Sequence, residues 1–309
     1  MIFDEICVYL TNACNSRCDT CNFWLTKNPV HLPTKTIDAV LDAYAKQGSL
    51  FVFGGGEPFV YDNIDYLEHK LQSLGGMVNY IILSNLKLVD QAIQSSFKRF
   101  TVSWNGVTSD STRYPDCTRN LIKFLDNKGT KQVRIAYVVS PENIQDLLAI
   151  DSVMLNRYMK EYNLPAPYFL FEADLSYFQR ESATDEEYGM SWLFRLFEKD
   201  PALQKHLVEI LSALNVPEYT LTAVKDLKQL FHIQCSNPIK SLQISWDNKI
   251  RFCPGIKWDN IIFDADEYFS NLHLNQSMLK TALSQCYVCS KLLQCGVGCR
   301  YHVDAKNYL

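Results

Sequence analysis

Three cysteines stand close together near the start of the chain, at a spacing that could hold a metal cluster. Cys14, Cys18 and Cys21 lie in the stretch ACNSRCDTCNFW and form the pattern CxxxCxxC. A tetrahedral zinc site or a four-iron cluster usually takes four protein ligands. A four-iron cluster held by these thiolates keeps one iron open, and an open iron can bind a small molecule through an amine and a carboxylate. The alternative is a zinc site that takes a fourth ligand such as His31 from elsewhere.

Most of the other cysteines gather at the far end of the sequence. The chain has 309 residues and 11 cysteines. The C-terminal group consists of Cys235, Cys253, Cys286, Cys289, Cys295 and Cys299, and its last four members form the pattern CxxCxxxxxCxxxC. An odd number of cysteines in a chain without secretion signals argues against a disulfide framework and favours metal binding. Cys7 falls inside an apolar run and is interpreted as a buried apolar side chain, whereas Cys117 is either an inert thiol or a hydrogen-atom donor near the substrate.

The elements that must position these cysteines alternate between strands and helices. Apolar runs typical of strands cover 6–10, 49–58, 78–85, 100–106, 132–140 and 167–174. Helical patterns cover 37–48, 62–74, 88–97, 118–127 and 143–162. Strand–helix repeats with apolar strands predict an α/β fold with a parallel sheet covered by helices. Because such connections are right-handed, we expect a partial (β/α)6 barrel of the TIM type, with its chemistry at the carboxyl ends of the strands.

The second half of the chain has a different texture. Residues 186–232 look helical and carry no recognisable chemistry, and residues 242–253 predict a β-hairpin that turns at Asp247 and Asn248. The cysteine density of 286–299 exceeds what a hydrophobic core requires. We therefore divide the chain into a barrel (1–185), a helical connector (186–232) and a small cysteine-rich domain (233–309).

Composition limits the partners of this protein. The formal net charge is -4 and 47% of the residues are hydrophobic, which suits a globular protein and gives no support for nucleic-acid binding. No stretch is apolar over the eighteen or so residues that a membrane span needs. The N-terminal stretch MIFDEICVYL lacks the basic start of a signal peptide. We expect a cytoplasmic protein without a membrane partner.

The cysteine pattern, placed directly after the first strand, resembles that of the radical S-adenosylmethionine (SAM) enzymes. In that family the CxxxCxxC loop holds a [4Fe-4S] cluster whose open iron chelates SAM, and reductive cleavage gives a 5′-deoxyadenosyl radical. The turn that contains Gly55, Gly56 and Glu57 follows the second strand, where the family has a GGE motif. The resemblance implies that this turn holds the ammonium group of SAM, because a cation favours a carboxylate and glycines let the backbone approach closely.

The resemblance also implies cofactor contacts at the ends of the next three strands. The residues at these points are Ser84, Asn85, Ser103, Asn105, Ser140 and Asn143. The first four of these could instead be ordinary turn formers. Two positions depart from the family pattern. Thr20 stands where an aromatic residue usually lies near the adenine, so that Phe23 or Trp24 would have to substitute, and Asn105 stands where Asp is usual. No side chain is assigned as catalytic.

The C-terminal cysteines resemble the auxiliary-cluster regions called SPASM and twitch. In the SPASM arrangement Cys235, Cys253 and Cys299 would hold one cluster, and Cys286, Cys289 and Cys295 a second, with His302 or Asp304 as candidates for a missing ligand. A twitch-like arrangement would use Cys235, Cys253, Cys286 and Cys289 for one cluster. The third alternative is zinc bound by the last four cysteines.

The resemblance implies an enzyme that abstracts a hydrogen atom from carbon. We expect a peptide substrate that is crosslinked, oxidised or given a thioether. The alternative is a dehydrogenase or epimerase of a small polar molecule such as an aminocyclitol, sugar or nucleoside. A hypothesis of another class is a non-catalytic iron-sulfur or zinc scaffold. An electron donor such as flavodoxin or ferredoxin is implied for the enzyme, and the sequence names neither the substrate nor the bond that changes.

Overall fold

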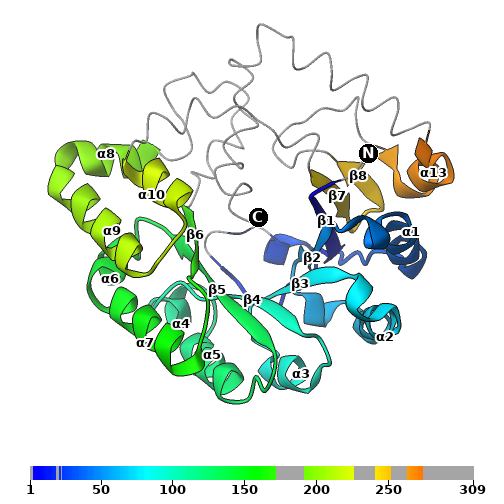
Figure 1. Cartoon of the computed structure of the whole chain (residues 1–309), viewed down its shortest axis with the longest axis horizontal. Coiled ribbons are helices and arrows are strands. Elements are labelled where there is room, and N and C mark those ends of the chain that lie inside the picture. Colours follow the sequence, from blue (N-terminus) through cyan, green and yellow to red (C-terminus); the bar gives the residue numbers. More distant parts are fainter. Residues whose placement is uncertain are drawn as a thin grey trace, which may run out of the picture.

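A computed structural model describes residues 3–18, 21, 23–171, 191–225, 241–251 and 263–273 (Figure 1). The predictions for the C-terminal cysteines fall outside the described residues. These predictions concern Cys235, Cys253, Cys286, Cys289, Cys295 and Cys299, together with His302, Asp304 and Thr20. Within the described part, no helix is long and apolar enough to cross a membrane.

Six parallel strands lie side by side in chain order and form the curved sheet predicted from the sequence (Figure 1). They are β1 (Glu5–Thr11), β2 (Leu50–Gly55), β3 (Asn79–Ser84), β4 (Arg99–Ser103), β5 (Gln132–Val139) and β6 (Tyr168–Phe171). Each crossover between them contains helix, as parallel neighbours require. The predicted α/β partial barrel is therefore confirmed.

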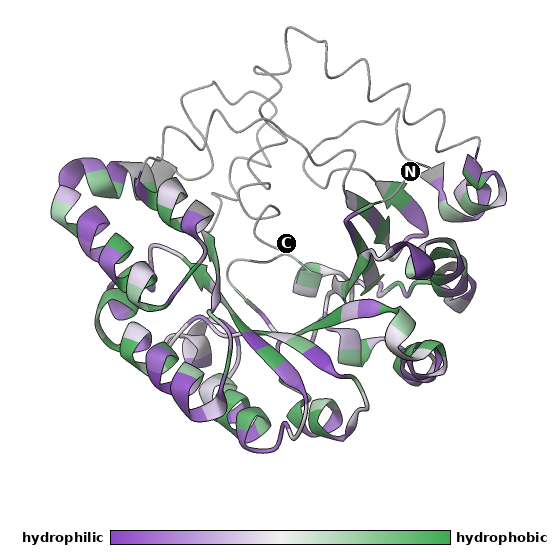
Figure 2. Ribbon diagram, viewed as in Figure 1, coloured by the Kyte–Doolittle hydropathy of each residue, from purple (hydrophilic) through white to green (hydrophobic). Residues whose placement is uncertain are grey.

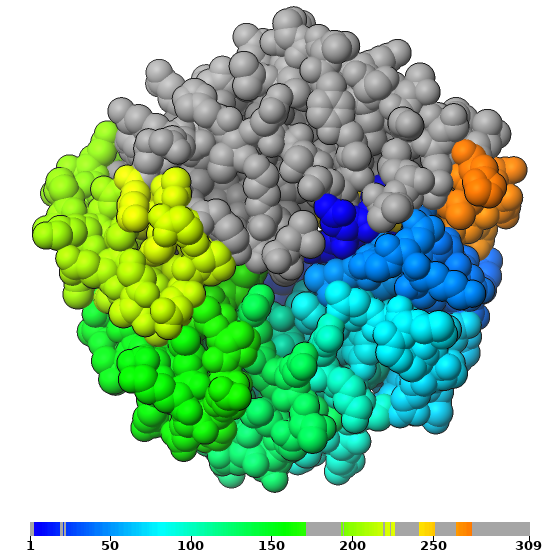
Figure 3. All heavy atoms as spheres, viewed as in Figure 1, coloured from blue at the N-terminus to red at the C-terminus, as the bar shows by residue number. Residues whose placement is uncertain are grey.

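The helices lie on the outside of this sheet. They are α1 (Thr34–Tyr44), α2 (Ile64–Leu74), α3 (Val89–Gln94), α4 (Ser109–Thr112), α5 (Cys117–Asp126), α6 (Ile144–Asp146) and α7 (Ser152–Tyr162). The sequence did not predict α4, and the single helix expected over 143–162 is interrupted by a π-helical turn, η5 (Leu147–Asp151). In the space-filling view, the segment coloured from cyan to green, which includes the helices after β2 to β5, forms one continuous outer surface (Figure 3).

The two faces of the sheet differ in how completely their side chains are buried. On β1, Ile6, Val8 and Leu10 are fully buried on the side that faces the helices. Cys7 and Tyr9 alternate with them on the inner side and are partly exposed. Figure 2 shows the strands mostly in the colours of apolar residues, with hydrophilic strips along the helices. The apolar core therefore lies between sheet and helices, whereas the inner face is less completely buried and carries partly exposed apolar side chains such as Ile81 and Leu83.

The predicted hairpin is present and joins the barrel sheet. β7 (Ser241–Ser245) pairs with β8 (Lys249–Arg251) in antiparallel fashion, and Asn248 takes a left-handed φ of 59° in the turn. β7 also pairs in parallel with β1, so the barrel sheet continues into the hairpin and ends at β9 (Phe263–Asp264). The sequence placed this hairpin in a separate domain and gave no signal for the β1–β7 pairing.

The connector is helical where the structure describes it. It contains α8 (Ser191–Lys199), α9 (Pro201–Ala213) and α10 (Glu218–Lys225). Asp200 caps α9, because its carboxylate accepts hydrogen bonds from the backbone N–H groups of Ala202 and Leu203. Near the end of the described chain, α13 (Ala265–Ser270) packs beside α1, where the hydroxyls of Tyr44 and Tyr268 lie 3.3 Å apart.

Candidate active site

The carboxyl edge of the sheet brings the cysteine loop and the glycine-rich turn into direct backbone contact. The N–H of Gly56 donates to the carbonyl of Thr11 at 2.7 Å, and the N–H of Glu57 donates to the carbonyl of Ala13 at 2.9 Å. A Cβ added to Gly56 would lie 1.8 Å from the carbonyl oxygen of Ala13. Gly55 takes a φ of 110°, which side-chain-bearing residues rarely adopt. The close approach that these glycines allow is toward the loop that carries the cysteines.

Glu57 is a buried carboxylate with a fixed position. Its Oε1 accepts hydrogen bonds from the Ser84 hydroxyl at 2.9 Å and from the Phe59 N–H at 3.3 Å. Its Oε2 accepts one from the N–H of Asn85 at 2.8 Å. Burial raises the pKa of Glu57 to about 7, against the lowering effect of these hydrogen bonds and of the Arg113 charge. No Lys, Arg or His of the described residues forms an ion pair with it, so the site favours an added cation.

Ser84 and Asn85 connect Glu57 to the cysteine loop. Besides donating to Glu57, the Ser84 hydroxyl accepts a hydrogen bond from the Leu86 N–H at 3.0 Å. The side-chain amide of Asn85 donates to Asn15 Oδ1 at 2.9 Å and lies 3.7 Å from the sulfur of Cys14. These two residues therefore position Glu57 and Cys14, and their direct contact with a cofactor stays a prediction.

The three N-terminal cysteines share one loop and act on one another electrostatically. The backbone N–H of Cys21 donates to the carbonyl of Cys18 at 3.2 Å, and the Ser16 hydroxyl lies 3.3 Å from the sulfur of Cys18. Burial, together with the charges of Glu57 and the other two cysteines, raises the pKa of Cys14 to about 11, against the lowering effect of a hydrogen bond from the backbone of Ser16. A bound metal favours thiolates and removes this penalty.

His31 and the potential ligands near the cysteine loop bear on the alternative of a single zinc ion. Within the described ranges, no three His, Cys, Asp or Glu side chains are placed to hold one metal ion. In a four-iron cluster each thiolate binds a different iron, which allows a wider spacing. His31, the proposed fourth zinc ligand, instead stacks on Tyr61 with 5.9 Å between ring centroids and pairs with Asp62 at 3.6 Å. The zinc alternative for this loop receives no support.

The predicted residues after β4 and β5 form a second hydrogen-bonded group. Asn105 Oδ1 accepts from the Val138 N–H at 3.1 Å. Asn143 Oδ1 accepts from the Ser140 N–H at 2.9 Å, and its amide donates to the carbonyl of Val138 at 2.7 Å. The amide of Asn143 also donates to the carbonyl of Asn105 at 3.4 Å, so both asparagines tie the two strand ends together. No hydrogen bond within the described part engages the hydroxyls of Ser103 and Ser140, so these two are the available donors for a ligand.

Sequence reasoning missed Arg113, which lies in the loop between α4 and α5. Its carbonyl accepts hydrogen bonds from the Ser16 hydroxyl at 3.1 Å and the Arg17 N–H at 3.2 Å, which fixes it against the cysteine loop. Its Nε is buried and has no hydrogen-bond partner among the described residues. The neighbouring Tyr114 hydroxyl donates to the carbonyl of Asn85 at 2.7 Å. The only signal in the sequence was a cation in the stretch RYPDC after the fourth strand.

Asp151 is a second residue that the sequence did not single out. It is fully buried on η5 and accepts hydrogen bonds from the Tyr137 hydroxyl at 2.6 Å and the Val107 N–H at 2.9 Å. Burial raises the pKa of its carboxyl. A Cβ on Gly106 would lie 1.6 Å from Asp151 Oδ2. The carboxyl therefore holds the turn that follows Asn105.

The remaining sequence candidates occupy positions beside the cysteine loop. Trp24 donates from its indole nitrogen to the carbonyl of Cys18 at 3.1 Å. Phe23 meets Trp246 edge to face, with 5.1 Å between ring centroids. Cys117 is buried at the start of α5, and burial raises the pKa of its thiol. Cys7 is partly exposed on the inner sheet face, and its thiol lies 3.0 Å from Glu5 Oε1. Burial nevertheless raises the pKa of this thiol, so the expected burial is found in part, beside a polar neighbour.

Comparison with known proteins identifies the class. The profile of the Radical SAM superfamily matches residues 8–151, which hold the cysteine loop, the glycine-rich turn and the ends of β3, β4 and β5 described above. These residues form a radical SAM domain, the catalytic unit of a superfamily of enzymes that use a [4Fe-4S] cluster and SAM.

Solved structures with similar folds include proteins bound to SAM and to peptides. SuiB from Streptococcus suis bound to SAM has a TM-score of 0.59 and 15% identity over 94% of this chain and 72% of SuiB. SuiB bound to the precursor peptide SuiA has a TM-score of 0.56 and 16% identity over 82% of this chain and 60% of SuiB. The structure of anSMEcpe with bound SAM and the Cp18Cys peptide has a TM-score of 0.53 and 14% identity over 97% of this chain and 90% of anSMEcpe. At these identities the similarity shows the fold, and a search of curated proteins found no match.

Proposed function

We propose that this protein is a radical SAM enzyme that modifies a peptide. The observation that carries the cofactor assignment is Glu57, a buried carboxylate without an ion-pair partner in the described part, held beside the loop of Cys14, Cys18 and Cys21. When bound, the cluster and SAM supply a 5′-deoxyadenosyl radical that abstracts a hydrogen atom from the substrate.

Different residues at the carboxyl edge bind different parts of the cluster and of SAM. Cys14, Cys18 and Cys21 hold the cluster as thiolates. Glu57 accepts the ammonium group of SAM, since its three hydrogen bonds leave the carboxylate ionised and fixed when a cation is added. The buried Nε of Arg113 donates to the carboxylate of SAM. Glycine residues 55 and 56 act indirectly, because they let the turn lie against the cysteine loop.

Support for a peptide substrate comes from the extent of the structural similarity. The two neighbours that were solved with peptides match 82% and 97% of this chain, well beyond the radical SAM domain. The C-terminal cysteine spacing resembles SPASM regions, whose members mostly act on peptides. We therefore favour a peptide over a small polar molecule such as an aminocyclitol or sugar, and we expect flavodoxin or ferredoxin as electron donor.

The test uses the full chain, reconstituted with iron and sulfide under anaerobic conditions. Short open reading frames beside its gene are expressed as peptides, and each is incubated with the enzyme, SAM and reductant. We expect one peptide whose mass changes in proportion to the 5′-deoxyadenosine formed. Cleavage of SAM with no change in any peptide, together with turnover of a small polar compound, would contradict the peptide assignment but keep the radical SAM assignment. The complete absence of cleavage would favour a non-catalytic scaffold.

We also propose two auxiliary clusters in the C-terminal region. Six cysteines supply two thiolates fewer than two complete clusters need, so at least one cluster would take a ligand other than cysteine. The reconstituted chain should then hold about twelve irons, in three clusters of four. About eight irons, unchanged in a Cys295→Ala, Cys299→Ala variant, would favour the twitch-like arrangement. Stoichiometric zinc would contradict both.

A further inference from the structure

An open cavity of about 610 Å³ lies at the amino end of the strands, opposite the candidate active site. Its walls come from the first residues of β4 and β5, from the loop before β5, and from residues 163–165 before β6. Ser103, at the carboxyl end of β4, is not among its lining residues. The cavity is thus separate from the candidate active site.

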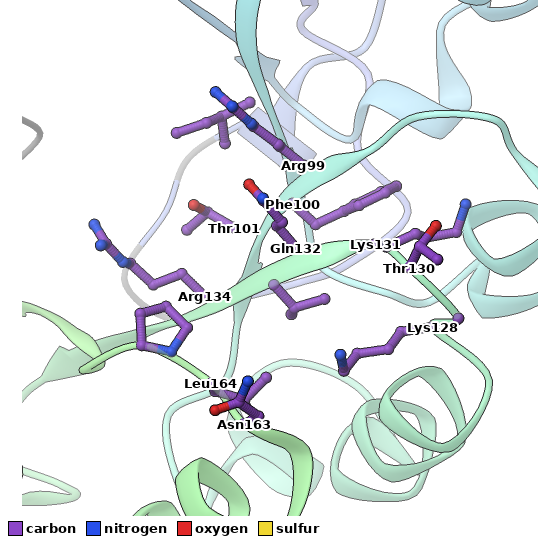
Figure 4. A pocket seen from close by; sticks show the side chains of 14 residues that line it. Arg99, Phe100, Thr101, Lys128, Thr130, Lys131, Gln132, Arg134, Asn163 and Leu164 are labelled. Carbon is purple, nitrogen blue, oxygen red and sulfur yellow. The ribbon is translucent and has the colours of Figure 1, made fainter.

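The charged side chains that line this cavity are all cationic. They are Arg99, Lys128, Lys131 and Arg134, and no acidic residue is among the described lining residues. The strand register pairs Arg99 with Gln132 and Thr101 with Arg134, so the two arginines are diagonal neighbours on one face of adjacent strands. Figure 4 shows both extending from these strands toward the same side of the cavity, while Lys128 and Lys131 belong to the loop before β5.

Three of these cations keep donors available for a ligand. Arg99 donates from Nη1 to Asn79 Oδ1, which leaves its other N–H groups free of protein partners in the described part. For Lys128 and Arg134 the described ranges contain no side-chain hydrogen bond or ion pair. The two exposed arginines therefore present planar forks of donors to the cavity.

Lys131 adds charge to the cavity without reaching into it. Lys131 is buried, and its ammonium group donates hydrogen bonds to the backbone carbonyls of Ser95 and Phe97, the latter at 3.2 Å. Burial and the charge of Lys98 lower the pKa of Lys131, while Glu68 opposes this effect. Glu68 accepts a hydrogen bond from the N–H of Ser96 and is not among the cavity residues. The local field is therefore positive on a chain whose net charge is -4.

We propose that this cavity binds the phosphate groups of a phosphorylated small molecule. Guanidinium groups bind phosphate through paired hydrogen bonds, and a phosphate offers more acceptor oxygens and charge than a carboxylate. Thr101 and Gln132 lie between the two arginines and supply neutral polar groups. The cavity volume suits a small molecule rather than a bare ion. This proposal does not depend on the radical SAM chemistry.

The test measures binding of inorganic pyrophosphate to the full chain by isothermal titration calorimetry at low ionic strength. The matched variants are Arg134→Gln, which changes the cavity, and Arg119→Gln, which removes the same charge from an exposed side chain outside it. We expect saturable binding that weakens with added salt, a loss of about ten- to a hundredfold in Arg134→Gln, and affinity within about twofold of wild type in Arg119→Gln.

Three results would overturn the proposal. The first is no saturable pyrophosphate binding by the wild-type chain. The second is an equal loss in Arg134→Gln and Arg119→Gln, which would indicate a general charge effect. The third is tighter binding of citrate than of pyrophosphate, which would assign the cavity to carboxylates. Circular dichroism of both variants confirms that they are folded, so that a loss of binding reports on the cavity.

Discussion

The two edges of the parallel sheet carry opposite charges, and these charges differ in burial: the carboxylate is buried and hydrogen-bonded, whereas the arginines are exposed. At the carboxyl edge, Glu57 is 1% exposed and accepts hydrogen bonds from two backbone N–H groups and the Ser84 hydroxyl, which the fold holds in place. At the amino edge, Arg99 and Arg134 are exposed and extend into an open cavity. A buried carboxylate is preorganised for one cation, because its hydrogen-bond donors are already fixed when the protein folds and need no reordering when the cation binds. Exposed arginines are screened and adaptable, so we expect weaker and more salt-sensitive binding there.

The largest effect should follow from closing the space at Gly56. In Gly56→Ala, the new Cβ would meet the Ala13 carbonyl at 1.8 Å, and backbone on either side must move. We expect a loss of about 3 kcal/mol in the free energy of unfolding, together with reduced iron loading at the cysteine loop. Urea unfolding and iron analysis measure both.

Gly76 offers the matched control for this substitution. A Cβ at Gly76 meets no atom within 4 Å, and the residue lies in η4 (Gly75–Met77) on the surface. Gly76→Ala should leave stability and iron loading near the wild-type values. Equal behaviour of the two alanine variants would show that the close contact between turn and cysteine loop does not matter.

The buried carboxylate should also be visible in the pH dependence of stability. Because the pKa of Glu57 is raised from 4.5 to about 7 in the folded protein, the folded state holds the proton more tightly than the unfolded state does. The stability contribution is therefore complete below pH 4.5 and is lost as the pH rises through about 7. Without SAM, we expect wild type to lose about 3 kcal/mol relative to Glu57→Gln over this range.

Denaturant unfolding of both proteins at several pH values measures this difference. Taking the difference removes contributions from other groups, such as Asp151, whose pKa burial also raises. A stability difference that does not change with pH would mean that Glu57 is ionised throughout. In that case a cation must already offset its burial, and the site would not be waiting for the ammonium group of SAM.

A smaller effect is expected on the affinity for SAM. Glu57→Gln removes the charge that pairs with the ammonium group, and the loss of a charge-assisted hydrogen bond costs about 1.5–3 kcal/mol. Equilibrium dialysis of the cluster-loaded chain should show roughly ten- to a hundredfold weaker binding. The control is Glu161→Gln on α7, an exposed residue in an ion pair with Arg157, which should bind SAM normally. An unchanged dissociation constant for Glu57→Gln would mean that Glu57 is only a turn residue and does not bind SAM.

The sequence predicted the barrel well because its signals are local. Apolar strands separated by helical patterns define β1 to β6 within a few residues. The signal fails where pairing depends on distant segments. β7 lies more than two hundred residues from β1 and joins it edge to edge, and nothing in either run specifies that partner. The π-helical turn at 147–151 also escaped, since its pattern does not differ from that of an α-helix.

The site residues likewise fall into those that local motifs predict and those that depend on contacts between distant segments. The cysteine pattern and the glycine-rich turn are short motifs, and their residue types alone indicate thiolate ligands and a close backbone approach. Arg113 contacts Ser16 of the cysteine loop although the two are 97 residues apart in the sequence, and Asp151 contacts Val107 at a separation of 44 residues. Their roles arise from the way the loops meet at the carboxyl edge. Ser84 and Asn85 were predicted as cofactor contacts, but what the structure adds is their hold on Glu57.

Reductive cleavage of SAM tests the central claim most directly. The chain, reconstituted anaerobically and given dithionite, should convert SAM to 5′-deoxyadenosine. The variant with Cys14, Cys18 and Cys21 all replaced by Ala should form none, because the thiolates that hold the cluster are absent. A Cys117→Ala variant keeps all three loop cysteines, and since Cys117 is a buried residue at the start of α5 and not one of the proposed cluster ligands, it should cleave SAM as wild type does. Normal formation of 5′-deoxyadenosine by the triple variant would contradict the account.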